Sequence, residues 1–323
     1  MRFFQRATLS VALAVFGYLL WKLDAREVLK IALGVGWGFL LILPQEGFCH
    51  LFNAAAWRLA FPEAKAARFK LGELWLLRVL GDSLNYLTPS ANIGGEVARA
   101  LMLHHEGTAE ERASSVVVAK FTQIAAQAGF LLLGFVFVVS AYLPASPHWV
   151  RARLAASWML TFSVGAYLVY SLWGRHWIRE AGIEEFAEKK LWGFGRVPWH
   201  LRMYFRRHPG RMGGSILLFL AAYFWSSIEA WLICRFIGLP IAWRMAMAVE
   251  VLSIGIDAVL LVPAKIGTQE TGKTAVFVLL GLPPASGFAF GLIRHVRELS
   301  WALAGMSVMA WAPRLAAYRK RKA

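Results

Sequence analysis

The sequence predicts an all-α integral membrane protein with six full spans and two re-entrant helical hairpins, about eight membrane-embedded segments arranged as an inverted-topology repeat. First, 58% of the residues are apolar and only 17% are charged, whereas about 25% of a typical soluble domain is charged. Second, apolar runs long enough to cross a bilayer recur along the whole chain. Third, two apolar stretches interrupted by Pro and Gly occupy matching positions in the two halves, as in transporters built from inverted repeats.

Apolar length and flanking charge locate the six full spans. They are expected at residues 7–21, 31–57, 113–141, 154–173, 213–237 and 286–311. The first is expected to be a retained span rather than a signal peptide, because no convincing small-residue cleavage site follows it. Pro44 should bend the second, since proline removes a helical hydrogen bond. We expect one polytopic domain over residues 1–323, with no soluble domain of appreciable size.

Two further regions are predicted to be pairs of short helices separated by a break. In the first pair Pro89 precedes Glu96 by seven residues. In the second, Pro263 precedes Glu270 by the same interval, 174 residues further along the chain. Chance is the alternative interpretation of this match, because Pro and Gly are common in membrane helices. The four short helices are expected at residues 71–88, 94–104, 245–262 and 270–281.

The distribution of Lys and Arg favours a hairpin that enters and leaves on one face for each broken pair. With the N-terminus inside, the predicted cytoplasmic segments hold 21 Lys and Arg residues and the external segments hold 6, in agreement with the positive-inside rule. Both termini are therefore expected in the cytoplasm, with the chain in a bacterial inner membrane. The two halves, about 1–141 and about 154–312, would then repeat the order span, span, hairpin, span from opposite faces.

The net charge of +16 indicates contact with anionic lipid headgroups rather than nucleic acid, because no nucleic-acid-binding motif is present. Residues 174–212 carry nine basic and four acidic side chains among several tryptophans. We expect this segment to lie in the cytoplasmic interface, and a disordered basic loop is the alternative. The basic tail at residues 319–322 is expected to anchor to anionic lipid.

Ionisable side chains inside apolar segments are costly unless paired or hydrated, so each is a candidate functional residue. In the first hairpin Arg78 and Asp82 are four residues apart and can pair on one helix face. Glu96 and Arg99 open the returning half-helix, whose free N–H groups favour an anion. The sequence therefore predicts a lipid-headgroup site, with candidate residues Arg78, Asp82, Asn85, Pro89, Gly94, Gly95, Glu96 and Arg99.

The second hairpin and the last span complete the predicted site. Glu270 begins its half-helix as Glu96 does, and Arg294 and Glu298 are spaced to pair. The substrate-binding residues expected here are Pro263, Lys265, Gly267, Glu270 and Arg297, beside the other ionisable residues Asp257 and Lys273. Snorkelling or a private ion pair is the favoured role of four further residues, Glu46, His50, Lys120 and Glu250.

The sequence lacks the motifs of the common catalytic and cofactor sites. P-loop, HExxH, GxSxG and metal-spaced His/Cys patterns do not occur. Cys49 and Cys234 lie far apart in apolar stretches, which favours packing over metal or redox chemistry. We therefore expect no cofactor, no metal and no catalytic residue.

The stretch from Asn85 to Leu103, Asn-Tyr-Leu-Thr-Pro-Ser-Ala-Asn-Ile-Gly-Gly-Glu-Val-Ala-Arg-Ala-Leu-Met-Leu, resembles the flippase-like membrane domain of lysylphosphatidylglycerol synthases. The second break, from Val262 to Glu270, resembles that family's Pro-Gly-Glu signature. The Asn-Ile-Gly-Gly-Glu form is most similar to the branch associated with hopanoid biosynthesis loci. Many relatives carry Glu-Arg-x-x-Asp on the next helix, where this chain has Ala-Lys-Phe-Thr-Gln from residue 119, so the ion pair of those relatives is not carried over.

The resemblance implies movement of an anionic or modified lipid, of the aminoacyl-phospholipid or hopanoid class, between leaflets. No aminoacyl-transferase domain follows the last span, so synthase activity is not expected. Two alternatives remain open. One is a membrane-embedded enzyme that modifies a lipid headgroup, with Glu96 or Glu270 as general base. The other is a non-catalytic partner of lipid-biosynthesis enzymes. The expected partners are membrane lipids, with those enzymes as further candidates.

Overall fold

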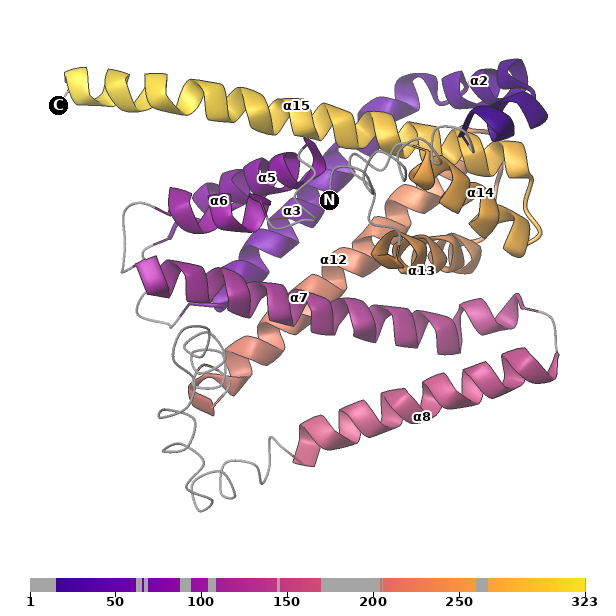
Figure 1. The fold of residues 1–323 in the computed structure, drawn as a ribbon, viewed down its shortest axis with the longest axis horizontal. Coiled ribbons are helices and arrows are strands. Elements are labelled where there is room, and N and C mark those ends of the chain that lie inside the picture. Colours follow the sequence, from indigo (N-terminus) through magenta and orange to yellow (C-terminus); the bar gives the residue numbers. More distant parts are fainter. Residues whose placement is uncertain are drawn as a thin grey trace, which may run out of the picture.

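The computed structural model describes residues 16–61, 66, 69–87, 94–103, 109–143, 146–169, 204, 206–259 and 267–322. Every regular element in these ranges is a helix (Figure 1). The predicted all-α class is therefore confirmed for the described part of the chain. Three predicted site residues, Pro89, Pro263 and Lys265, lie outside it, as do most of the predicted first span and most of the segment 174–212.

The helices follow one another in two comparable series. The first half contains α2 (Ala25–Leu33), the short 3-10 helix η1 (Gly36–Gly38), α3 (Phe39–Leu59), α5 (Leu71–Leu87), α6 (Gly94–Met102), α7 (Ala109–Phe137) and η2 (Val139–Ala141). The second half contains α8 (Pro147–Val169), α12 (Pro209–Phe236), α13 (Trp243–Val259), α14 (Thr268–Leu279) and α15 (Pro284–Lys322). The four predicted short helices correspond to α5, α6, α13 and α14.

The chain bends sharply before α3, at a position that the sequence did not predict. Residues Ala25–Leu33 and Gly36–Leu59 meet at 66°. Gly36 has a φ of 46°, a left-handed conformation that glycine adopts without steric penalty. α3 continues as one helix through Pro44, and a bend at that residue stays a prediction. Proline keeps a helical φ, whereas a left-handed residue interrupts the helix outright.

Residues 22–30, which are predicted to lie on the external side of the membrane, contain most of α2, and their side of the membrane stays a prediction. The helix begins after Asp24, whose side chain accepts a hydrogen bond from the Arg26 N–H at 3.0 Å. This is the usual role of aspartate at a helix start. α2 then packs against α15, so the segment belongs to the folded bundle.

Two of the described helical stretches are long and apolar enough to cross a membrane. They are Arg112–Ala141, with 30 residues, and Pro209–Phe236, with 28, and they match two predicted spans. The bent pair of α2 and α3 is a third if it counts as one span. α15 has 39 residues, about 58 Å at 1.5 Å per residue, and it continues past its predicted end at residue 311. The apolar helices indicate a membrane protein, and the number of full spans stays a prediction.

α3 and α12 form an antiparallel pair at the centre of the bundle. Phe236 at the end of α12 packs on Gly38 at the start of α3. Ser215, near the start of α12, donates to the carbonyl oxygen of Ala56 near the end of α3 at 3.0 Å. The two large buried apolar clusters form around these helices, so the pair provides the frame on which the shorter helices rest.

α5 with α6, and α13 with α14, form two helical hairpins, and α15 packs on α5 of the first and on α14 of the second (Figure 1). The packing partners correspond between the halves. α3–α5 matches α12–α13, α6–α7 matches α14–α15, and α5–α15 matches α13–α7. An inverted repeat predicts this exchange of partners. The re-entrant position of the hairpins in the membrane stays a prediction.

Candidate functional site

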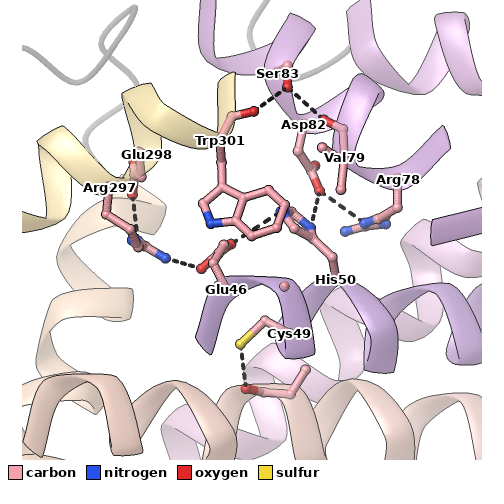
Figure 2. Close-up of polar contacts among 12 residues, drawn as sticks. Glu46, Cys49, His50, Arg78, Val79, Asp82, Ser83, Arg297, Glu298 and Trp301 are labelled. Atoms are coloured by element: carbon pink, nitrogen blue, oxygen red, sulfur yellow. Dashed lines mark hydrogen bonds and ion pairs between the residues drawn. The ribbon is translucent and has the colours of Figure 1, made fainter. Parts of the chain in front are cut away.

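Asp82, whose side chain is 34% exposed, is the centre of a cluster of ion pairs in the first hairpin, and both of its arginine partners are buried. Its Oδ1 lies 2.5 Å from a terminal nitrogen of Arg99 on α6. Its Oδ2 lies 3.2 Å from Nε of Arg78, one turn earlier on α5 (Figure 2). Arg78 also donates to the Gln123 side chain on α7 at 3.2 Å. The predicted Arg78–Asp82 contact is therefore present, and the cluster joins three helices.

Arg99 is held by two carboxylates and a backbone carbonyl. Besides Asp82 it contacts Glu96 at 2.6 Å and donates to the carbonyl oxygen of Arg78 at 3.3 Å. Lys120 on α7 reaches the other oxygen of Glu96 at 3.2 Å. Because the Arg99 side chain is only 1% exposed, an anion can reach it only after Asp82 or Glu96 has released it.

Asn85 and Gly95 close the first hairpin. The Asn85 side-chain oxygen accepts a hydrogen bond from the Gly95 N–H at 2.7 Å, and so satisfies one of the free donors where α6 begins. A Cβ atom on Gly95 would overlap the carbonyl oxygen of Gly81 and would lie 2.7 Å from the Asn85 side chain. The two helices therefore approach so closely that residue 95 must be glycine. Gly94 is the first residue of α6.

The second hairpin carries its own ion pairs. Lys273 Nζ on α14 lies 2.7 Å from Asp257 Oδ1 on α13 and donates to the carbonyl oxygen of Ser253 at 3.4 Å. Glu270 Oε1 lies 3.0 Å from Nδ1 of His295 on α15. The other oxygen of Glu270 accepts a hydrogen bond from the Gly267 N–H at 3.0 Å. Gly267 and Glu270 thus lie at the start of the returning helix, as predicted.

The two hairpins have the same arrangement of contacts. In each, a base on the second helix pairs with an aspartate on the first helix and donates to a backbone carbonyl about one turn before that aspartate. A base from the following long helix contacts the glutamate at the start of the second helix. Corresponding residues lie 174 or 175 positions apart: Arg78 and Ser253, Asp82 and Asp257, Glu96 and Glu270, Arg99 and Lys273, and Lys120 and His295.

His50 on α3 connects the first hairpin to the last helix. Its Nδ1 lies 3.3 Å from Asp82 Oδ2, and its Nε2 lies 3.7 Å from Glu46 Oε1, four residues earlier (Figure 2). The second oxygen of Glu46 pairs with Arg297 on α15. Arg297 also lies 3.2 Å from Glu229 on α12. Side-chain contacts therefore connect the charged residues of the first hairpin to those at the centre of the bundle.

Arg294, one turn before Arg297, extends this network to the second hairpin. It contacts Glu229 at 3.4 Å and Glu250 on α13 at 2.5 Å. An unbroken series of side-chain contacts thus runs from Lys120 on α7 to Glu250 on α13. We call this series the charge network.

A family description matches nearly the whole chain. Residues 6–305 match the Lysylphosphatidylglycerol synthase TM region. The chain belongs to this family. No curated protein and no solved structure matches it. Family membership, together with the apolar helices, identifies a membrane protein with a function related to membrane lipids.

In this member of the Lysylphosphatidylglycerol synthase TM family, several charged residues have partners other than those predicted. Arg294 contacts carboxylates of α12 and α13, which its spacing from Glu298 did not predict. Glu298 contacts Arg297 and Gln269, each at 3.4 Å. All four residues predicted to snorkel or to pair privately belong to the shared network: Glu46, His50, Lys120 and Glu250.

Two residues of these ion-pair networks, His295 and Glu229, were not predicted from the sequence to belong to the site. His295 could have been found, since it follows Lys120 at the same 175-residue offset that separates Asp82 from Asp257. Glu229 had no such signal, because its partners lie on α15, more than 60 residues away in the chain. Only the packing of α12 on α15 brings them together.

The described residues hold no group of three or more His, Cys, Asp or Glu side chains arranged for a metal ion. Cys49 and Cys234 are buried free thiols. The Cys49 thiol donates to the carbonyl oxygen of Ala222 at 3.7 Å (Figure 2), across the α3–α12 contact. This thiol therefore has a packing role between the two central helices.

Proposed function

We propose that this chain is a lipid flippase, which moves an anionic or modified lipid between the leaflets of a bacterial inner membrane. Both termini face the cytoplasm in this proposal, and the lipid leaves with its chemistry unchanged. Its class is aminoacyl-phospholipid or hopanoid, because the first break resembles the branch associated with hopanoid biosynthesis. Membership of the Lysylphosphatidylglycerol synthase TM family supports the assignment to lipids.

The recurrence of one ion-pair arrangement in two hairpins carries the proposal. In transporters built from inverted repeats, equivalent broken helices provide the substrate site near the bilayer midplane. Irregular backbone at that depth is tolerated only where protein or water covers it. In our proposal the two hairpins line the lipid-headgroup path.

The buried bases would attract the headgroup. Arg99 and Lys273 are at most 1% exposed and are already paired with carboxylates. A phosphate can replace a carboxylate at such a base, since both accept charge-assisted hydrogen bonds. We therefore propose exchange, in which the headgroup displaces Glu96 from Arg99. The proposed substrate-binding residues are Arg78, Asp82, Asn85, Pro89, Gly94, Gly95, Glu96, Arg99, Pro263, Lys265, Gly267, Glu270 and Arg297.

Reconstitution into lipid vesicles tests the proposal. Labelled phosphatidylglycerol, aminoacyl-phosphatidylglycerol and a hopanoid are followed between leaflets by chemical quenching of the outer label. We expect at least one of them to move faster than in vesicles without protein. Equal rates with and without protein for all three would refute the assignment.

Matched variants then locate the site. Arg99→Gln and Lys273→Gln should each reduce transport to the background rate, because each removes a buried base that the headgroup needs. Arg151→Gln is the control, since Arg151 is exposed on α8 and should transport as wild type does. Size-exclusion chromatography of each purified variant separates loss of transport from loss of folding.

Mass spectrometry of the same vesicles distinguishes the two alternatives. A new lipid species formed only with protein would favour an enzyme that modifies headgroups. Unchanged lipids, together with wild-type growth of cells that carry both hairpin variants, would favour a non-catalytic partner of lipid-biosynthesis enzymes. The flippase proposal requires unchanged lipids and a transport defect in the hairpin variants.

A further inference from the structure

His50 occupies an unusual place in the charge network. Its side chain is 5% exposed, and both of its ring nitrogens face carboxylates, Asp82 at 3.3 Å and Glu46 at 3.7 Å. The indole ring of Trp301 lies edge-on, with its centroid 5.4 Å from that of the imidazole (Figure 2). His50 is therefore enclosed between two acids and an aromatic ring.

Five helices contribute the charged groups that contact His50 or its partners. α5 provides Asp82 together with Arg78, and α6 provides Arg99, which holds the other oxygen of Asp82. α3 itself provides Glu46. α15 provides Arg297 and Glu298, and α12 provides Glu229 through Arg297. His50 thus lies at the junction between the first hairpin and the central helices.

The network contains nearly equal numbers of basic and acidic side chains. The series from Lys120 to Glu250, with Glu298 at its side, contains five basic and six acidic side chains: Lys120, Arg99, Arg78, Arg297 and Arg294 against Glu96, Asp82, Glu46, Glu229, Glu250 and Glu298. Each acid lies against at least one Lys or Arg. His50 differs from the other members because it lies between two of these acids, Asp82 and Glu46.

The number of protons on the imidazole decides how many carboxylates it can bind. A neutral imidazole has one N–H, so it donates to Asp82 or to Glu46 and turns a lone pair toward the other. A protonated imidazole donates to both. Histidine is also the side chain whose charge ordinarily changes between pH 5 and 8.

We propose that His50, with Glu46 and Asp82, is a proton-binding site that couples proton movement to lipid transport. This inference rests on the proposed flippase function. A proton taken from water on one side links Asp82 on α5 to Glu46, and through Glu46 to Arg297 on α15. Its release to water on the other side breaks one of these two contacts, and so loosens the first hairpin from the last helix.

Direct titration of His50 tests the site without any transport measurement. The protein, labelled with 15N in its eight histidines, is reconstituted into phosphatidylglycerol vesicles and followed by solid-state NMR from pH 5 to pH 8.5. The signal missing in His50→Gln belongs to His50, and His148→Gln removes an exposed histidine on α8 as the assignment control. We expect the His50 signal to change from the protonated to the neutral pattern. A constant pattern over this range overturns the proposal.

Transport under a pH gradient tests the coupling. For one proton per lipid, each pH unit across the vesicle membrane supports up to about a tenfold lipid imbalance, which corresponds to 1.4 kcal/mol. We expect wild type and His148→Gln to build an imbalance that grows with the gradient, and His50→Gln to equalise the leaflets. An imbalance that persists in His50→Gln, or that disappears instead in His295→Gln, overturns the proposal.

The two measurements separate this inference from the function on which it rests. Titration of His50 without acceleration of any lipid contradicts the flippase proposal and removes the coupling with it, while the proton site remains. Lipid transport that does not depend on the pH gradient contradicts only the proposed coupling to protons, and the flippase proposal remains.

Discussion

At the scale of single residues, burial decides how much each charge of the network matters. Asp82 is itself 34% exposed, but its partners Arg78, Arg99 and His50 are at most 6% exposed. Lys120, at the end of the network, keeps 39% of its side chain exposed. Removing one member of a buried ion pair leaves the other without compensation, whereas exposed pairs contribute little.

Asp82→Asn should therefore destabilise the protein far more than Lys120→Gln does. We expect a loss of about 3–5 kcal/mol in the free energy of unfolding for Asp82→Asn, and of about 1 kcal/mol or less for Lys120→Gln. Equilibrium unfolding in mixed micelles measures both. Similar losses in the two variants would show that the cluster around Asp82 does not hold the hairpin.

Gly95 allows a second prediction at this scale. Gly95→Ala should push α6 away from α5, because the new Cβ would overlap the carbonyl oxygen of Gly81, with a cost of about 1–3 kcal/mol. Gly129→Ala in the middle of α7 is the control, since nothing lies within 4 Å of a Cβ there and alanine favours the helix. The midpoint of thermal unfolding should fall in the first variant only. An unchanged midpoint in Gly95→Ala would contradict the close approach.

At the scale of elements, each hairpin is held by one ion pair between its two helices. In the second hairpin this pair is Asp257 with the fully buried Lys273. Its counterpart in the first hairpin, Asp82 with Arg99, has a similar distance, 2.5 Å against 2.7 Å. The carboxylate lies on the first helix and the base on the second in both cases, so exchange of the two charges should preserve the attraction.

The double variant Asp257→Lys with Lys273→Asp should recover stability that either single variant loses. Each single change places like charges together in a buried site, and the exchange restores an opposite pair. A double-mutant cycle built on unfolding midpoints gives the coupling between the two positions. Additive losses in the double variant would show that this pair does not join α13 to α14.

The sequence predicted the hairpin helices but not the connections between them. Two Pro–Glu intervals located α5, α6, α13 and α14, and helical spacing predicted the contact of Asp82 with Arg78. These patterns are local, so one sequence contains them. The bend at Gly36 depends on the left-handed backbone conformation of that one glycine. No pattern in the sequence singled it out from the other glycines. The contacts of His50 and Glu229 arise from packing between distant helices, which no local spacing encodes.

At the scale of the whole molecule, the halves exchange their packing partners. α7 packs on the second hairpin through α13, and α15 packs on the first hairpin through α5. Each half therefore supplies the long helix that supports the hairpin of the other. An inverted repeat with one hairpin entering from each face gives this arrangement. It requires that the chain enters the two hairpins from opposite sides of the membrane.

Labelling of single cysteines placed directly before each hairpin tests this requirement most directly. In a background with Cys49 and Cys234 replaced by Ala, Lys70→Cys precedes α5 and Ala242→Cys precedes α13, and both positions are exposed. A membrane-impermeant maleimide should label residue 242 in intact spheroplasts and residue 70 only in inverted vesicles. Labelling of both positions from the same side would contradict the inverted repeat and the lipid path built on it.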